Sequence, residues 1–93
     1  MHTINQGVNK FYIGDSENEP LAEMCYTNAG EKIIIIDHTF VSETLRGQKI
    51  GNLLLDRVVE LAELQNKKIT PLCPFAKAAM LKEPEKYAAI LHK

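Results

Sequence analysis

Three parts of the sequence hold residue types that can do chemistry. The stretch from Leu45 to Asn52, Leu45-Arg46-Gly47-Gln48-Lys49-Ile50-Gly51-Asn52, places glycines and basic residues at the entrance of a predicted helix. His38 follows a run of four isoleucines, and Cys73 lies in a segment with a proline on either side. An imidazole can serve as a base near neutral pH, and a thiol as a nucleophile or an acid. Their use depends on the elements that position them.

The glycine-containing stretch favours phosphate binding. No Ser, Thr, Asp or Asn occupies positions 45 to 48, so the first amides of the helix have no obvious side-chain cap. These amides carry partial positive charge and need an acceptor, which a phosphate supplies. Gly47 and Gly51 allow close approach, and Arg46 and Lys49 add positive charge. The alternative is that Gly47 is itself the N-cap and water satisfies the amides.

Hydrophobic patterning predicts an α/β fold with a mixed sheet. We expect strands at 8–13, 21–27 and 32–37, the last continuing through 38–41, with a tight turn at 28–31. A long amphipathic helix at 48–66 precedes a strand at 68–73, a short helix at 75–82 and helical turns at 85–91. Residues 1–7 are polar and are expected to be loose. Short links make the first three strands antiparallel, whereas the helix crossover makes the fourth parallel to the third.

The isoleucine run at 33–36 predicts a central strand buried on both faces. Because the third and fourth strands are parallel, their carboxyl ends meet at the edge where the long helix begins, which is where ligands bind in open α/β sheets. This placement brings His38 and Cys73 near the phosphate loop. Structural roles stay open for both, since a cysteine at a strand end is often a small buried filler. Cys25, in mid-strand, is interpreted as a packing residue.

Composition sets limits on the class of protein. The chain has 93 residues and a mass of 10.5 kDa, which predicts one small domain over 1–93. Lys and Arg total 11 against 12 Asp and Glu, which argues against a nucleic-acid partner bound through bulk charge. The longest purely apolar run, 33–36, is far short of the roughly 20 residues of a membrane span. With no visible export signal, we expect a cytoplasmic protein with reduced thiols and no metal.

The segment Arg46-Gly47-Gln48-Lys49-Ile50-Gly51 resembles the acetyl-coenzyme A pyrophosphate loop of the GNAT superfamily of N-acetyltransferases, whose usual pattern is Arg or Gln, two residues, Gly, one residue, then Gly or Ala. More narrowly, the chain is similar to the small single-domain YjdJ-type members. Their marks correspond here to His38-Thr39-Phe40-Val41, Arg46-Gly47-Gln48, Pro71-Leu72-Cys73-Pro74 and the tail Glu83-Pro84-Glu85-Lys86-Tyr87. The resemblance covers nearly the whole chain.

The resemblance implies a minimal GNAT-like domain that uses acetyl-coenzyme A as cosubstrate. The fourth strand would splay from the third, and the pantetheine arm would enter the gap and bring the thioester close to Cys73 and His38. The implied coenzyme-binding residues are the backbone of Phe40 and Val41 for the arm, Arg46, Gly47, Gln48, Lys49, Ile50, Gly51 and Asn52 for the pyrophosphate, and, by position alone, Phe75 and Lys77. Lys49 departs from the family pattern, which has Gly there. The Tyr that many members carry after the Cys-Pro position is also absent, because the candidate registers are Met80, Leu81, Lys82 and Glu83.

Acetyl transfer to an amine needs a base, and His38 is the nearby candidate. Cys73 would donate a proton to the departing thiolate, or would carry the acetyl group transiently. Two alternatives to an enzyme stay open: a coenzyme A-binding module with little catalysis, and a structural or regulatory domain without coenzyme. The acceptor is expected to be an amine on a small molecule or a protein; its identity and the oligomeric state are not predicted.

Overall fold

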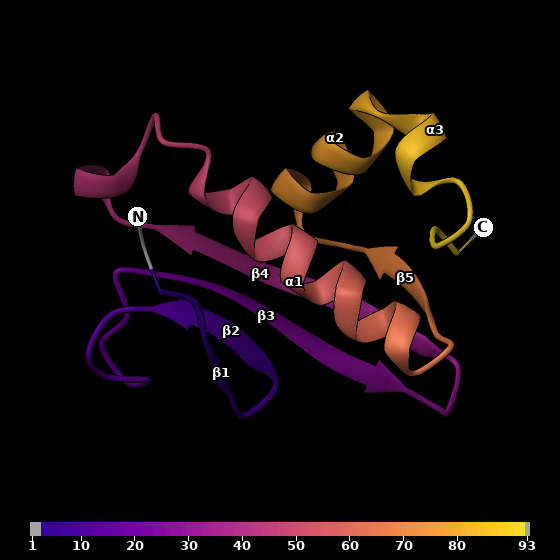
Figure 1. Cartoon of the computed structure of the whole chain (residues 1–93), viewed down its shortest axis with the longest axis horizontal. Helices are drawn as coiled ribbons and strands as arrows, with labels where there is room; N and C mark the ends of the chain where they lie inside the picture. The colour runs from indigo at the N-terminus through magenta and orange to yellow at the C-terminus, as the bar shows by residue number, and fades with distance from the viewer. Residues whose placement is uncertain (1–2, 93) are drawn as a thin grey trace.

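A computed structural model describes residues 3–92. The elements are β1 (Asn5–Gly7), β2 (Lys10–Ile13), β3 (Ala22–Ala29), β4 (Ile33–Val41), the 3₁₀ turn η1 (Glu43–Leu45), α1 (Ile50–Leu64), β5 (Lys68–Pro71), α2 (Pro74–Lys82) and α3 (Pro84–Tyr87). The five strands form one sheet in the order β1-β2-β3-β4-β5, antiparallel from β1 to β4 and parallel between β4 and β5. Figure 1 shows α1 crossing the sheet, with α2 and α3 beside it.

The core lies between α1 and one face of the sheet. Alternate residues in the first part of β3 are buried (Ala22, Met24 and Tyr26), as are Ile34 and Ile36 of β4. The buried stripe of α1 has helical spacing and comprises Ile50, Gly51, Leu54, Leu55, Val58 and Ala62. Within residues 3–92, all helices pack on this face, so the opposite face of the sheet has no helical layer.

The mixed α/β fold and the order of strands and helices are confirmed, but the start of the chain differs from the prediction. The expected strand at 8–13 corresponds to β2 alone, which begins at Lys10, because residues 8–9 form a tight turn in which Asn9 has a left-handed φ of 56°. An additional strand that was not expected, β1, precedes this turn and pairs with β2. The expectation that 1–7 are loose is therefore wrong for Asn5–Gly7, while residues 1–2 lie outside the described residues. An edge strand pairs through its backbone, so its side chains need not be apolar.

The prediction that β4 is buried on both faces is also wrong. Ile34 and Ile36 are fully buried, whereas Ile33 and Ile35 are half-buried because they face the side without helices. A run of four apolar residues is typical of a strand buried on both faces, but among the described residues helices cover only one face of this sheet.

Several boundaries move for local reasons. Helix α1 begins at Ile50 rather than Gln48, because Lys49 has φ 58°. The helix is followed by Asn66, which has a left-handed φ of 56°. The turn after β3 falls one or two residues later than 28–31 and uses Gly30, with φ 74°. Strand β5 ends at Pro71 rather than Cys73.

The outer edge of β5 is covered by the C-terminal segment. The amide of Ile69 donates to the Ile90 carbonyl at 2.7 Å, and the amide of His92 donates to the Ile69 carbonyl at 2.8 Å. Over residues 3–92, none of the helices has the length and apolar character needed to cross a membrane.

Two leucines of α1 provide a matched test of the core. Leu54 is 0% exposed and Leu64 is 83% exposed. We expect Leu54→Ala to lower the free energy of unfolding by about 2–5 kcal/mol, because it removes buried contacts and leaves a cavity. Leu64→Ala should change it by less than about 0.5 kcal/mol. Urea unfolding of both variants measures the difference, and equal effects would contradict this placement of α1.

Candidate coenzyme and acyl-transfer site

A gap opens between β4 and β5 at their carboxyl ends. The two strands pair only from Ile33 with Lys68 to Ile36 with Pro71, although β4 continues to Val41. The amides of Leu72 and Cys73 both donate to the Ile36 carbonyl at 2.9 Å, after which the chain turns into α2. The splay expected between these two strands is therefore present.

A β-bulge in β4 decides which residues face the gap from each side. Cys25 pairs with His38 and Tyr26 with Ile36, so Asp37 is the extra residue. The Asp37 carboxylate accepts a hydrogen bond from the Thr27 hydroxyl at 2.7 Å. The bulge reverses the alternation, so that Thr39 and Val41 join the helix-covered face while His38 and Phe40 face the other way.

The bulge also changes which backbone groups are available in the gap. The Ser42 amide donates to the carbonyl of Leu21, the residue directly before β3. In an antiparallel pair of strands, the backbone N–H and C=O groups of successive residues point alternately toward the partner strand and away from it. Those of Phe40, two residues before Ser42, therefore point toward its partner Glu23. The backbone of Thr39 and Val41 is directed at the gap instead. The resemblance implied Phe40 with Val41 for the arm and did not include Thr39, and nothing in the sequence marks the bulge that turns the Thr39 backbone toward the gap.

Cys73 lines the gap on the helix-covered face. Its side chain is 5% exposed, and its thiol donates to the Thr39 hydroxyl at 3.1 Å. It is also the N-cap residue of α2, which begins at Pro74. The thiol is thus held at the start of a helix, beside the end of β4 that has no pairing with β5.

His38 lies on the opposite face. Its Nε2 is 3.7 Å from a carboxylate oxygen of Glu23, whose other oxygen is 3.1 Å from Lys10 Nζ. The structure therefore brings His38 and Cys73 to the same end of β4 but on opposite sides of the sheet. Cys25 is on the His38 side, and burial raises the pKa of its thiol, with the Glu23 charge adding to the effect. A protonated, half-buried Cys25 agrees with a packing role.

The loop before α1 exposes the amino end of the helix. Gly47 has φ 86°, and Lys49, the N-cap residue, has φ 58°. The side chain of the N-cap residue makes no capping hydrogen bond, and the Leu53 amide donates to the Lys49 carbonyl at 3.2 Å. The amides of residues 50–52 come before this first helical hydrogen bond, so they have no partner within the helix. Lys49 occupies a left-handed position that glycine adopts more readily.

A pocket of ≈ 270 Å³ collects most of the predicted coenzyme-binding residues. It is lined by Val41, Leu45, Arg46, Gly47, Lys49, Ile50, Gly51, Asn52 and Phe75. The Arg46 guanidinium also donates to the Val41 carbonyl at 3.3 Å, which ties the loop to the end of β4. Predicted residues Phe40, Gln48 and Lys77 do not line this pocket.

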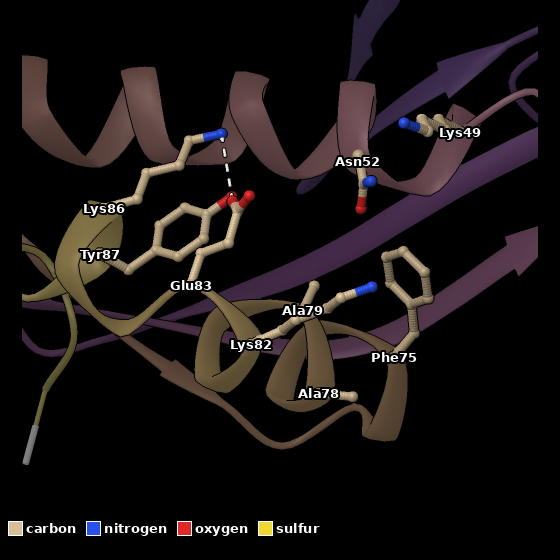
Figure 2. A pocket seen from close by; sticks show the side chains of 9 residues that line it. All are labelled: Lys49, Asn52, Phe75, Ala78, Ala79, Lys82, Glu83, Lys86 and Tyr87. Atoms are coloured by element: carbon tan, nitrogen blue, oxygen red, sulfur yellow. Dashed lines mark ion pairs between the residues drawn. The ribbon is translucent and has the colours of Figure 1, made fainter.

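An adjoining groove of ≈ 440 Å³ runs between α1 and the two C-terminal helices. Figure 2 shows its lining residues: Lys49, Asn52, Phe75, Ala78, Ala79, Lys82, Glu83, Lys86 and Tyr87. Lys86 is paired with Asp56 at 3.6 Å and with Glu83 at 3.7 Å, and Asp56 raises the pKa of the Lys86 ammonium. Lys49 and Lys82 add two more cationic side chains to the groove.

Lys82, and not the predicted Lys77, is the lysine of α2 that lines this groove. Phe75, Ala78, Ala79 and Lys82 have the i, i+3, i+4, i+7 spacing of one helix face, and Lys77 is on another. The same spacing is readable in the sequence and would have indicated Lys82. Tyr87 is only 4% exposed and lies against the groove, with Lys86 Nζ 5.2 Å from its ring centre.

Phe75 separates the pocket from the groove and lies directly against α1. A Cβ atom at Gly51 would be 2.4 Å from the Phe75 ring. The close approach predicted for Gly51 is therefore, in this structure, an approach of an aromatic ring to the helix backbone.

Comparison with known proteins places the chain in a family. A family model described as GCN5-related N-acetyl-transferase matches residues 10–90. The chain belongs to this family. The sequence has no match among the curated proteins compared with it.

Solved structures agree with the assignment. A GCN5-like protein from Staphylococcus aureus, studied by NMR in solution, is 48% identical, with a TM-score of 0.80 over 97% of this chain and 87% of its own. A GNAT family acetyltransferase from Elizabethkingia anophelis with acetyl-CoA bound is 20% identical, with a TM-score of 0.60 over 84% of this chain. A GNAT family acetyltransferase from Staphylococcus aureus Mu50 is 18% identical, with a TM-score of 0.57 over 82%. This chain covers 51% and 50% of the last two chains, and their likeness supports the fold.

The contact between Gly51 and Phe75 can be tested with a double-mutant cycle. In the native chain, Gly51→Ala adds a methyl group against the ring, and such overpacking costs about 1–3 kcal/mol. In a Phe75→Ala background the clash is absent, and alanine should raise stability by up to about 1 kcal/mol through helix propensity. Urea unfolding of the four proteins should give a coupling of at least about 1 kcal/mol. Additive effects would show that the ring does not occupy this position.

Proposed function

We propose that this protein is an acetyl-coenzyme A-dependent N-acetyltransferase that acts on an amine, with residues 1–93 forming a minimal domain. The observation that carries the proposal is that three features lie at one end of β4: a helix start whose N-cap side chain makes no capping hydrogen bond, a pocket that reaches Val41, and a stretch of β4 without pairing to β5, where Thr39 contacts the buried Cys73 thiol. The acetyl-CoA bound to the Elizabethkingia anophelis protein, which shares the fold, supports this coenzyme.

The residues present fit such a coenzyme. The amides at the start of α1 are suited to a pyrophosphate, with Arg46 and Lys49 supplying charge. The gap-facing backbone of Thr39 and Val41 can pair with the amides of a pantetheine arm, as an added strand would. The cationic groove that contains Lys82 is suited to the phosphate at the nucleotide end.

The opposed positions of His38 and Cys73 suit a transfer between two faces. The bound coenzyme supplies an acetyl thioester. An alkyl amine has a pKa near ~10.4, so it must lose a proton before it can attack, and His38 can take that proton on the helix-free face. Cys73 can donate a proton to the leaving thiolate from the helix side. In this scheme the acceptor and the coenzyme enter from opposite sides of the sheet.

A coenzyme A-binding module with little catalysis is the second candidate. It is favoured by the absence of a tyrosine from 80–83 and by the burial of Tyr87, at 4% exposure, away from solvent. Release of free thiol from acetyl-CoA only when an amine is present supports the enzyme, whereas tight binding without amine-dependent release supports the module.

The coenzyme site is tested by titrating coenzyme A into ¹⁵N-labelled protein. We expect the amide resonances of residues 48–52 to move, because they lie at the phosphate site. Arg46→Gln should weaken binding roughly tenfold and reduce its dependence on salt, since one charge contact of about 1.4 kcal/mol is lost. Lys77→Met, on another face of α2, is the control. If the amides of 48–52 do not move, the site is not where we place it.

Two substitutions separate the possible roles of Cys73. Cys73→Ala should slow amine-dependent thiol release at least tenfold and leave coenzyme A affinity nearly intact, because the thiol touches the reacting end only. Cys73→Ser keeps a proton donor but makes a poor acyl carrier, so it should retain more activity than Cys73→Ala if the residue is an acid. Cys25→Ala is the control for loss of a thiol. Unchanged turnover in Cys73→Ala would remove this residue from the mechanism.

A further inference from the structure

A line of three polar side chains crosses the helix-free face of the sheet. Lys10 comes from β2, Glu23 from β3 and His38 from β4. One carboxylate oxygen of Glu23 is 3.1 Å from Lys10 Nζ, and the other is 3.7 Å from His38 Nε2. Glu23 therefore connects a lysine on one neighbouring strand with the candidate base on the other.

The exposure of the three side chains indicates which of them are fixed. The side chains of Glu23 and Lys10 are 17% and 21% exposed, whereas that of His38 is 59% exposed. Lys10 Nζ also donates to the Glu17 carbonyl at 3.4 Å, so it has a second anchor. A largely covered carboxylate, held by a lysine with two hydrogen-bond partners, presents a negative charge to an exposed imidazole.

We propose that Glu23 is a positioning residue for His38, and that Lys10 keeps Glu23 in place. The inference rests on the proposed function, in which His38 accepts a proton from the acceptor amine. With Nε2 turned toward Glu23, Nδ1 is the nitrogen left to receive that proton. The negative charge of Glu23 then lies where it attracts the imidazolium that forms.

Other ionisable groups near this face have separate partners or roles. Asp37 accepts a hydrogen bond from Thr27, and the Glu17 carboxylate accepts one from the Val8 amide at 2.9 Å. Tyr12 is opposite Glu23 in the register, and Cys25 is opposite both Lys10 and His38. The hydrogen bond to Glu23 raises the pKa of Lys10, so the lysine stays cationic and does not compete as a base. Glu23 is thus the carboxylate paired with His38 across the strands.

The first test is spectroscopic and does not need the acceptor. Long-range ¹H–¹⁵N correlation spectra at pH 7.5 report the two ring nitrogens of each histidine. Glu23→Gln, which keeps the shape and removes the charge, should move the ring nitrogen resonances of His38 and leave those of His92 in place. Lys10→Met should cause a smaller change in the same direction. Glu17→Gln is the matched control. An unmoved His38 ring in Glu23→Gln would overturn the proposal.

The second test separates this proposal from the proposed function. Amine-dependent thiol release is measured with acetyl-CoA and spermidine or a lysine-containing peptide as probe amine. Glu23→Gln should lower kcat about five- to fiftyfold with the KM for acetyl-CoA unchanged, and Glu23→Asp should restore part of the rate. In a His38→Ala background, Glu23→Gln should have no further effect, because it acts through the ring.

Each kinetic outcome has one reading. If His38→Ala slows release and Glu23→Gln does not, the positioning role is wrong and the proposed function stands. If Glu23→Gln slows release equally with and without His38, Glu23 does not act through the ring and the proposal is overturned. If His38→Ala releases thiol at the native rate, the role of His38 in the proposed function fails, and the positioning role fails with it.

Discussion

The carbonyl oxygen of Ile36 is the last point at which β4 and β5 are joined. It accepts the amides of both Leu72 and Cys73 at 2.9 Å, and Pro71 and Pro74 on either side have no N–H to extend the pairing. Beyond this bond, β4 continues paired with β3 only, and the chain after β5 turns into α2. This carbonyl therefore marks where the gap begins and holds the backbone of Cys73 beside it. The two prolines noted in the sequence are therefore the residues that end one strand and begin one helix.

Much of this architecture could be predicted because the responsible patterns are local. The amphipathic spacing of α1, the left-handed Asn66 and the uncapped helix start are each encoded within a few neighbouring residues. The parallel relation of β4 and β5 follows from the helix between them. These features were sufficient to locate the glycine loop, His38 and Cys73 at one end of the sheet.

What could not be predicted depends on contacts between distant segments. Strand β1 is polar and forms because β2 offers it a backbone edge. Half-burial of Ile33 and Ile35 reflects the absence, within residues 3–92, of a second helical layer. The bulge at Asp37 is the clearest case: it arises from pairing with β3, and it exchanges the faces of every later residue of β4. If the backbone direction alternated without a bulge, the N–H and C=O of Phe40, and not those of Thr39, would face the gap.

The backbone hydrogen bonds of the C-terminal segment shield one edge of the sheet. The segment from Ile90 to His92 occupies the hydrogen-bonding groups on the free side of Ile69, in a strand that would otherwise end the sheet. An uncovered parallel edge is a template for other polypeptides to add to, and proteins commonly shield such edges. The segment at 90–92 thus occupies the hydrogen-bonding groups of Ile69 to which another strand would add, while the opposite edge of the sheet is the three-residue β1.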